Sequence, residues 1–319
     1  MKTIAVLTSG GDSPGMNPAI RGVVRTAVAA GMEVIGVRRG YAGLIEGDLI
    51  ELRTTWVSGI IREGGTKLLT ARSEEFKTPA GQRKGAETLK ARGVEGLVVI
   101  GGNGSAHGAY CLHQKFGIAT VLVPSSIDND LAGTDVSIGF QTAVNTAVEA
   151  IDKIRDTAVS HDRVFVVEVM GREAGFLALE VALAGGAEHV LIPEIPFSLT
   201  KIGIAIKEGH ERGKVSSIIV VAEGAAKGIA VAAEIEAITG ADTRATVLGH
   251  VQRGGSPCAT DRILGVRLGA AAVELLAKGQ NGMVGIKGSE VVVSPIETVW
   301  RKKKTIDKDL YELARTLSQ

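Results

Sequence analysis

The sequence has little cysteine, few aromatic residues and almost no net charge. Its two cysteines, Cys111 and Cys258, are too few for a disulfide framework or for a zinc site built from cysteine alone. The 36 Lys and Arg residues nearly balance the 35 Asp and Glu residues, so no overall basic field attracts nucleic acid or an anionic membrane. The chain also lacks an apolar stretch long enough for a membrane span, and its first apolar run is too short for a signal peptide. We therefore expect reduced thiols, a cytoplasmic location, and neither a nucleic-acid nor a membrane partner.

Glycine, by contrast, is abundant, with 42 residues in a chain of 319. No Gly/Ser linker or short repeat accounts for them, which places many in turns that approach a ligand. The length and the 45% of apolar residues suit one large or two medium α/β domains.

Short apolar runs rich in β-branched residues alternate with longer amphipathic stretches. The predicted strands are residues 4–8, 33–37, 96–101, 119–124, 163–169, 189–193, 217–223 and 245–250. The predicted helices include residues 18–30, 106–116, 142–158, 200–212 and 261–278. This alternation predicts an α/β protein with mainly parallel sheets flanked by helices.

Polar, glycine-rich clusters follow these strands six times. They are residues 9–13, 101–105, 125–130, 170–172, 223–224 and 250–255. Because ligands of open α/β sheets bind at the carboxyl ends of the strands, we expect the clusters to converge on one crevice. Unrelated surface turns are the alternative, but they leave the recurrence of Arg, Asp and Gly unexplained.

The cluster at residues 101–105 lies between a strand and a helix, where backbone N–H groups and the helix dipole bind phosphate. It is no Walker A loop, because no Gly-Lys-Ser/Thr triplet follows. It also fails the dinucleotide fingerprint, because the third glycine falls at Gly108 rather than at position 107. A P-loop enzyme and a nicotinamide dehydrogenase are both disfavoured.

The acidic cluster and the arginines indicate phosphoryl transfer. Asp128 and Asp130 follow a buried strand, where one carboxylate can accept a proton and the other can help to hold Mg²⁺, although a loop-capping role is the alternative. Five arginines lie in or beside the candidate ligand loops, where guanidinium groups stabilise a transferring phosphoryl group: Arg72, Arg163, Arg172, Arg244 and Arg253.

Three further features have two interpretations each. His250 can hydrogen-bond a sugar hydroxyl or phosphate, or can be a structural histidine. Glu223 can accept hydrogen bonds from a sugar or can form a buried ion pair. Arg21 and Arg25 lie four residues apart on one helix face, a spacing that usually marks a solvated stripe.

Four separated segments resemble the bacterial ATP-dependent 6-phosphofructokinases. They are Thr8-Ser-Gly-Gly-Asp-Ser-Pro-Gly-Met-Asn17, residues 124–130, Met170-Gly-Arg172, and residues 249–257. The resemblance implies that the chain uses ATP and Mg²⁺ to convert fructose 6-phosphate to fructose 1,6-bisphosphate, in a homotetramer of two-domain subunits with active sites between the domains. The implied domains are residues 1–139 and 253–303, which bind ATP, and residues 140–252 and 304–319, which bind fructose 6-phosphate.

The resemblance also implies the roles of individual residues. The ATP-binding set is Gly11, Arg72, Ser73, Gly102, Asn103, Gly104, Ser105 and Gly108. Asp128 matches the base that activates the sugar 1-hydroxyl, and the other sugar-phosphate or transition-state contacts are Ser126, Ile127, Asp130, Met170, Gly171, Arg172, Glu223, His250 and Arg253. Gly11, Arg72 and Arg172 belong to the catalytic set with Asp128, while Asn103 and Asp130 are the candidate Mg²⁺ ligands.

Two further groups imply contacts between subunits. Arg163 and Arg244 match the pair that reaches the 6-phosphate from a neighbouring subunit. An allosteric site for ADP or phosphoenolpyruvate is implied by Arg21, Arg25, Arg155, Gly186, Glu188, Arg212 and Lys214.

The chain departs from the family pattern at four places. Asn103 replaces the usual Asp that helps to position Mg²⁺, Ser125-Ser126 replaces Gly-Thr, Glu173 replaces a frequent His, and Gly59 replaces an acidic residue at the effector site. Asn103 leaves open a weakly active regulatory paralogue. A pyrophosphate-dependent enzyme is the other alternative, but such relatives carry Asp in place of Gly104 and Lys in place of Ser125, so ATP is favoured.

Overall fold

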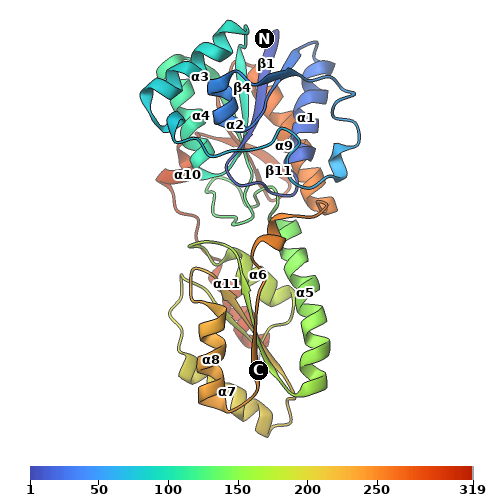
Figure 1. Cartoon of the computed structure of the whole chain (residues 1–319), viewed down its shortest axis with the longest axis vertical. Coiled ribbons are helices and arrows are strands. Elements are labelled where there is room, and N and C mark those ends of the chain that lie inside the picture. Colours follow the sequence, from blue (N-terminus) through green and yellow to red (C-terminus); the bar gives the residue numbers. More distant parts are fainter. Residues whose placement is uncertain (318–319) are drawn as a thin grey trace. The chain divides into compact units, whose positions relative to one another are not determined.

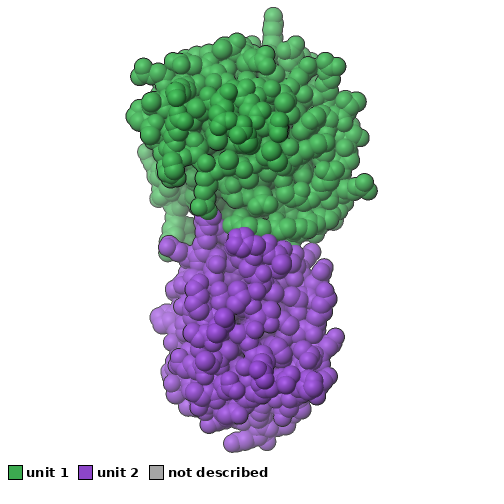
Figure 2. Space-filling view, in the orientation of Figure 1, with its two compact units in different colours: residues 1–127, 131–142, 253–304 green, residues 128–130, 143–252, 305–319 purple. Residues whose placement is uncertain are grey.

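The structure is a computed structural model that describes residues 1–317 (Figure 1). The last two residues of the predicted fructose-6-phosphate domain, 318 and 319, lie outside the described residues. The chain forms two compact units, each of which is described by itself (Figure 2). Unit 1 comprises Met1–Ile127, Leu131–Thr142 and Arg253–Lys304, and unit 2 comprises Asp128–Asp130, Ala143–Gln252 and the chain from Thr305 onwards.

Unit 1 is built on a seven-stranded sheet of order β11-β10-β5-β4-β1-β2-β3. The strands are β1 (Thr3–Ser9), β2 (Glu33–Val37), β3 (Leu49–Glu51), β4 (Gly96–Gly101), β5 (Ala119–Pro124), β10 (Gly282–Lys287) and β11 (Glu290–Ser294). The five inner strands are parallel, and only the two edge strands, β3 and β11, pair antiparallel with their neighbours. In this register Ser9 lies opposite Gly101, and Gly101 lies opposite Pro124, so the segments after β1, β4 and β5 leave the sheet side by side.

Helices cover both faces of this sheet (Figure 1). They are α1 (Met16–Ala29), α2 (Gly40–Glu46), α3 (Pro79–Ala91), α4 (Asn103–Phe116), α9 (Ala259–Ala277) and α10 (Thr298–Arg301), with the short 3₁₀ helices η1 (Ile60–Arg62) and η2 (Glu75–Lys77). One core packs α1 and α9 against Val6 and Val98, and the other packs α2, α3 and α4 against Leu7 and Val99. Neighbouring strand residues thus enter opposite cores, which explains why the strands are continuous apolar runs.

Unit 2 is built on a four-stranded parallel sheet of order β7-β8-β6-β9. Its strands are β6 (Val164–Val169), β7 (His189–Leu191), β8 (Ser217–Ala222) and β9 (Thr243–Val247). Its helices are α6 (Phe176–Ala184), α7 (Leu199–Glu211), α8 (Gly228–Thr239), α11 (Lys308–Leu317), and α5 (Phe140–His161) from Ala143 onwards. Helices α7 and α8 pack on Val164, Val166, Ile219 and Val221, which belong to one hydrophobic core cluster of this unit.

The predicted α/β class, with mainly parallel sheets flanked by helices, is confirmed. The strand predicted at residues 245–250 was wrong in position, because β9 is Thr243–Val247 and the 3₁₀ helix η3 (Gly249–Arg253) follows it. Gly249 has φ +55, a left-handed conformation that ends an extended strand. Among residues 1–317, no helix is long and apolar enough to cross a lipid bilayer.

Candidate active-site loops and neighbouring pockets

Three of the predicted ligand loops lie side by side in unit 1, after β1, β4 and β5. Ser105 Oγ donates a hydrogen bond to the carbonyl of Ser9 at 2.9 Å, which ties the amino end of α4 to the first loop. Ser13 Oγ and Ser125 Oγ lie 2.6 Å apart, which joins the first loop to the third. The backbone N–H of Ser125 donates to the carbonyl of Gly101 at 3.0 Å. Loops that are far apart in the sequence are therefore held at one edge of this sheet.

Gly11 allows Arg253 to approach the first loop. A Cβ atom at Gly11 would lie 2.4 Å from Arg253 Nη1. The same Nη1 donates a hydrogen bond to the carbonyl of Asp12 at 3.1 Å. A larger residue at position 11 would displace the guanidinium group, so the glycine is needed for a close approach rather than for its φ angle.

The amino end of α4 faces the same edge. Gly102 is the N-cap residue and Asn103 begins a helix of 14 residues. A Cβ atom at Gly104 would meet nothing within 4 Å, so the space in front of this turn is open. The N–H groups and the dipole of a helix amino end favour an anion such as phosphate.

Tyr41 supports this turn from behind and was missed by the sequence analysis. Its hydroxyl donates to the carbonyl of Ser105 at 2.7 Å, and its ring stacks on Phe76 at 4.1 Å. A Cβ atom at Gly108 would lie 2.5 Å from the Tyr41 ring. Gly108 thus makes room for Tyr41, whose burial raises the pKa of its phenol well above the usual value.

The other predicted site residues of unit 1 range from exposed to buried. Arg72 is exposed, two residues after Thr70, whose hydroxyl donates to the carbonyl of Gly10 at 2.8 Å. Ser73 Oγ accepts a hydrogen bond at 3.1 Å from the N–H of Phe76, which belongs to η2. Ser126 accepts one from Ser137 Oγ through its carbonyl, and the adjoining Ile127 is 1% exposed.

Unit 2 brings Asp128, Arg172 and Glu223 together. Asp128 Oδ2 lies 3.4 Å from Arg172 Nε, and the Asp128 side chain is 5% exposed against 57% for Arg172. Glu223 Oε1 accepts a hydrogen bond from the backbone N–H of Arg172 at 2.9 Å. The turn that carries Arg172 has left-handed backbone, with φ +134 at Gly171 and φ +52 at Arg172. A buried carboxylate thus lies beside an exposed guanidinium group at the carboxyl ends of β6 and β8.

Gln252 fixes this turn and was also missed as a functional residue. It is fully buried, and its Oε1 accepts a hydrogen bond from the backbone N–H of Met170 at 2.8 Å. Its neighbour His250 is exposed on η3. The segment around Gln252 stands out in the sequence, but a neutral amide gives no sign there of a chemical role.

The five predicted phosphate-binding arginines do not all converge within one chain. Arg172 follows the carboxyl end of β6, whereas Arg163 directly precedes β6 and Arg244 is the second residue of β9. Because β6 and β9 are parallel, Arg163 and Arg244 lie at the opposite edge of the sheet from Arg172. The prediction that all five arginines lie in or beside the ligand loops was therefore wrong for these two, whereas their role as contacts from a neighbouring subunit stays a prediction.

Most of the predicted effector residues gather in unit 2. Arg155 Nη2 donates to the carbonyls of Gly185 at 2.7 Å and Gly186 at 2.6 Å. Glu188 Oε1 lies 3.8 Å from Arg155 Nη1 and 3.5 Å from Lys214 Nζ. Glu188, Arg212 and Lys214 line a cavity of about 630 Å³. Arg21 and Arg25 lie on α1 of unit 1, where burial, followed by repulsion from Arg25, lowers the pKa of Arg21.

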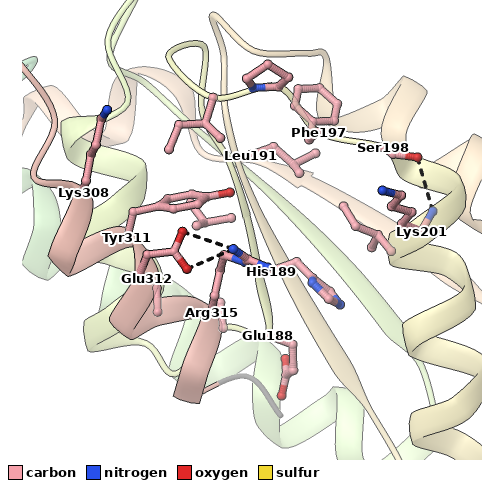
Figure 3. A pocket seen from close by; sticks show the side chains of 16 residues that line it. Glu188, His189, Leu191, Phe197, Ser198, Lys201, Lys308, Tyr311, Glu312 and Arg315 are labelled. Atoms are coloured by element: carbon pink, nitrogen blue, oxygen red, sulfur yellow. Dashed lines mark hydrogen bonds and ion pairs between the residues drawn. The ribbon is translucent and has the colours of Figure 1, made fainter.

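A second cavity, of about 590 Å³, lies between α11 and the β7–α7 segment (Figure 3). Tyr311 and Lys308 of α11 line one side, and Phe197 and Lys201 line the other. His189 and Glu188 line both this cavity and the previous one. Burial lowers the pKa of His189, which favours its neutral form. The two cavities therefore share part of their walls.

Few protein groups are placed to hold a metal ion by themselves. Over residues 1–317, no group of three or more His, Cys, Asp or Glu side chains is arranged for a metal. Mg²⁺ in phosphoryl-transfer enzymes is commonly held by one or two protein oxygens together with substrate phosphates. Asn103 belongs to unit 1 and Asp130 to unit 2, and each carries a side-chain oxygen of the kind that serves as one such protein ligand.

Comparison with known proteins gives closely similar relatives over the whole chain. The family model described as phosphofructokinase matches residues 3–276. The chain is 56% identical to the ATP-dependent 6-phosphofructokinase of Shouchella clausii and 57% identical to that of Halalkalibacterium halodurans, in each case over 100% of both proteins. Among solved structures it is similar to a Saccharomyces cerevisiae phosphofructokinase, with a TM-score of 0.87 and 37% identity, over 99% of this chain and 47% of the yeast chain.

Proposed function

The chain belongs to the phosphofructokinase family, and we propose that it transfers the γ-phosphoryl group of ATP to the 1-hydroxyl of fructose 6-phosphate. The observation that carries the proposal is the buried Asp128 carboxylate 3.4 Å from the exposed Arg172 guanidinium group. A carboxylate there can accept the hydroxyl proton, and a guanidinium group there can stabilise negative charge on the moving phosphoryl group. The same step belongs to glycolysis.

Unit 1 supplies the proposed nucleotide site. The amino end of α4 and the adjoining loops after β1 and β5 present N–H groups for the phosphates, with Gly102, Asn103, Gly104 and Ser105 in the first turn. Gly11 keeps Arg253 beside the first loop. Arg72 would supply positive charge from the segment that Thr70 ties to Gly10.

Unit 2 supplies the proposed sugar-phosphate site. Glu223 and Gln252 hold the Met170–Arg172 turn by accepting hydrogen bonds from its backbone N–H groups. Glu223 and His250 would bind sugar hydroxyls, and Asp130 would lie near the metal. In the reaction the 1-hydroxyl oxygen attacks the γ-phosphorus, its proton passes to Asp128, and the bond between phosphorus and the bridging oxygen of ADP breaks. Asn103 and Asp130 would each offer an oxygen to the Mg²⁺ ion that accompanies ATP, which when bound would supply neutralising charge for the triphosphate.

The first experiment is the formation of fructose 1,6-bisphosphate by the purified full-length protein with Mg²⁺, comparing ATP with pyrophosphate. We expect turnover with ATP, because the relatives that match over the whole chain are named ATP-dependent and because the space at Gly104 is open. Asp128→Asn should lower kcat by about 10²- to 10⁴-fold, the usual effect of losing a general base. Asp135→Asn, a matched change of an exposed aspartate that accepts a hydrogen bond from the N–H of Gly288, should retain activity. Turnover with pyrophosphate alone would refute the donor assignment.

Asn103 gives the one reason to retain a second function, that of a regulatory paralogue which binds sugar phosphate without turning it over. Folded protein that binds fructose 6-phosphate but shows no turnover with either donor would support this function. An assembly of four chains and regulation by ADP or phosphoenolpyruvate are further parts of the proposal. The regulatory part is supported by Glu188, Arg212 and Lys214, which line one cavity, and by Arg155, whose Nη1 lies 3.8 Å from Glu188 Oε1.

A further inference from the structure

Asp242 lies between two arginines at the amino edge of the unit 2 sheet. Arg163 Nε donates a hydrogen bond to Asp242 Oδ2 at 2.6 Å, and Arg244 Nε lies 2.8 Å from Asp242 Oδ1. Each carboxylate oxygen therefore pairs with one arginine. The backbone fixes the arrangement, because Val164 and Thr243 are paired in the sheet and the N–H of Val164 donates to the carbonyl of Asp242 at 3.1 Å.

We propose that Asp242 is a positioning residue for phosphate recognition, which holds the guanidinium groups of Arg163 and Arg244 so that both can contact one phosphate group. The proposal rests on the proposed function, in which these two arginines bind the 6-phosphate of the sugar substrate. Asp242 itself does not contact the phosphate.

The geometry leaves the outer ends of both arginines available. Both contacts with Asp242 are made through Nε. In the part of the chain that the structure describes, the Nη atoms of Arg163 and Arg244 make no hydrogen bond. A guanidinium group has five N–H donors, so those on Nη can still form the paired hydrogen bonds that phosphate accepts. The Arg244 side chain is 60% exposed and that of Arg163 is 29% exposed, so both can be reached from solvent.

Charge explains why a carboxylate is needed here. Two guanidinium groups that approach one phosphate also repel each other, and a carboxylate between them offsets that repulsion. The group of three keeps a net charge of +1, which still attracts a phosphate dianion. The hydrogen bond from Arg163, aided by Arg244, lowers the pKa of Asp242 and keeps it ionised at neutral pH.

The position of this group indicates which phosphate it serves. Arg163 and Arg172 lie at opposite ends of β6, a strand of six residues and about 20 Å at the usual rise per residue. The two arginines therefore cannot hold one small sugar phosphate within the same chain. On the proposed function, the group formed by Asp242, Arg163 and Arg244 binds the phosphate end of a substrate that a second copy of the chain holds.

The test measures the kinetics of Asp242→Asn, which removes the charge and one acceptor oxygen while preserving the size of the side chain. We expect KM for fructose 6-phosphate to rise by about tenfold, the effect of weakening one charge-assisted contact, with kcat and KM for ATP changed by less than about twofold. Asp242→Glu restores the carboxylate and should recover most of the affinity. Glu51→Gln is the control, because Glu51 forms a similar exposed pair with Arg53, through Nε at 2.9 Å, in unit 1.

Two kinetic outcomes would overturn the proposal. An unchanged or lower KM for fructose 6-phosphate would show that Asp242 is neutral or competes with the phosphate. Loss of kcat and of affinity for both substrates, with a lower unfolding midpoint, would show a merely structural role.

Calorimetric titration with fructose 6-phosphate in the absence of ATP separates this proposal from the proposed function. A roughly tenfold weaker Kd for Asp242→Asn supports the positioning role even if the parent protein shows no turnover with either donor. Equal Kd values, or no binding to the parent protein, overturn it.

Discussion

Gly11 shows how one residue without a side chain determines where another acts. Arg253 Nη1 occupies the volume that a methyl group at position 11 would need. Gly11→Ala should therefore displace Arg253 from the carbonyl of Asp12 and lower kcat/KM by about 10- to 100-fold, because small displacements of positioning groups are costly in catalysis. Steady-state kinetics measure the loss, and thermal unfolding checks that the fold is retained. Unchanged kinetics in a folded variant would show that Arg253 is not needed at this place.

Replacing Asn103 with aspartate should affect both the stability of α4 and the binding of Mg²⁺, and the two effects can be measured separately. It is the first residue of α4, so Asn103→Asp adds negative charge at a helix amino end, which stabilises a helix by about 0.3–1 kcal/mol. On the proposed function the same charge also strengthens Mg²⁺ binding, so we expect a higher rate at limiting Mg²⁺ and half-activation at a lower Mg²⁺ concentration. Asn103→Ser, which is neutral, is the matched control. A more stable variant with unchanged Mg²⁺ dependence would show that the metal is held by other groups.

At the scale of elements, Asp261 connects the beginnings of two helices in unit 1. It lies in the first turn of α9 and is fully buried. Oδ1 accepts from the N–H of Gly139 at 2.8 Å, and Oδ2 accepts from the N–H and the hydroxyl of Thr142 at 2.7 and 2.6 Å. These backbone N–H groups lie at the amino end of α5. The first N–H groups of a helix have no acceptor within that helix, so Asp261 supplies one.

Asp261→Asn should destabilise the protein, because an amide NH₂ would face donors that have lost their acceptor. The expected decrease in the free energy of unfolding is about 1–3 kcal/mol, measured by urea denaturation. Asp135→Asn, at an exposed aspartate that also accepts a backbone hydrogen bond, should change it by less than about 0.5 kcal/mol. If both variants have the same midpoint, Asp261 does not anchor α5.

The inner elements were predictable because their signals are local. Strands such as β4 and β8, buried on both faces, are uninterrupted apolar runs with glycine or polar residues after them. The edge strands β3 and β11 and the inner strand β10 were not predicted, because a strand of three residues, or a run interrupted by glycine and charge, carries little pattern. The sequence analysis also missed α2, α3, α6, α8, α10 and α11. Helix α6 has Glu180 as its only charged residue among nine, so the helical period that marks an amphipathic helix is absent.

The residues of the candidate site also fall into two groups, those that a local sequence pattern marks and those that it does not. The glycine-rich loops and the acidic cluster are visible because each lies within a few consecutive residues. The roles of Tyr41, Gln252 and Asp242 depend on partners 64, 82 and 79 residues away, respectively. No pattern in a single sequence records such contacts, and only the fold brings these side chains together.

At the scale of the whole molecule, the separation of Arg163 from Arg172 has a consequence for assembly. A parallel sheet has its ligand-binding loops at the carboxyl ends of its strands, yet Arg163 and Arg244 lie at the amino ends. The proposed function requires groups at both the carboxyl ends and the amino ends of these strands to serve one reaction. Each sugar phosphate must then contact two copies of the chain. Activity then depends on the association of chains and falls when the protein dissociates on dilution.

Mixing two defective variants tests this directly. Asp128→Asn lacks the proposed base, and Arg163→Ala lacks the proposed contact from the neighbouring copy, so each alone should have low activity at low fructose 6-phosphate. After dissociation and reassociation together, some sites combine Asp128 of one chain with Arg163 of another, and activity should exceed the sum of the separate variants several-fold. A mixture of Asp128→Asn with Arg172→Ala is a matched control for the opposite edge. Because Arg172 lies 3.4 Å from Asp128 in the same chain, every mixed site still lacks one of the two groups, and no recovery is expected. Equal behaviour of the two mixtures would mean that Arg163 acts within its own chain, which the parallel order of β6 and β9 opposes.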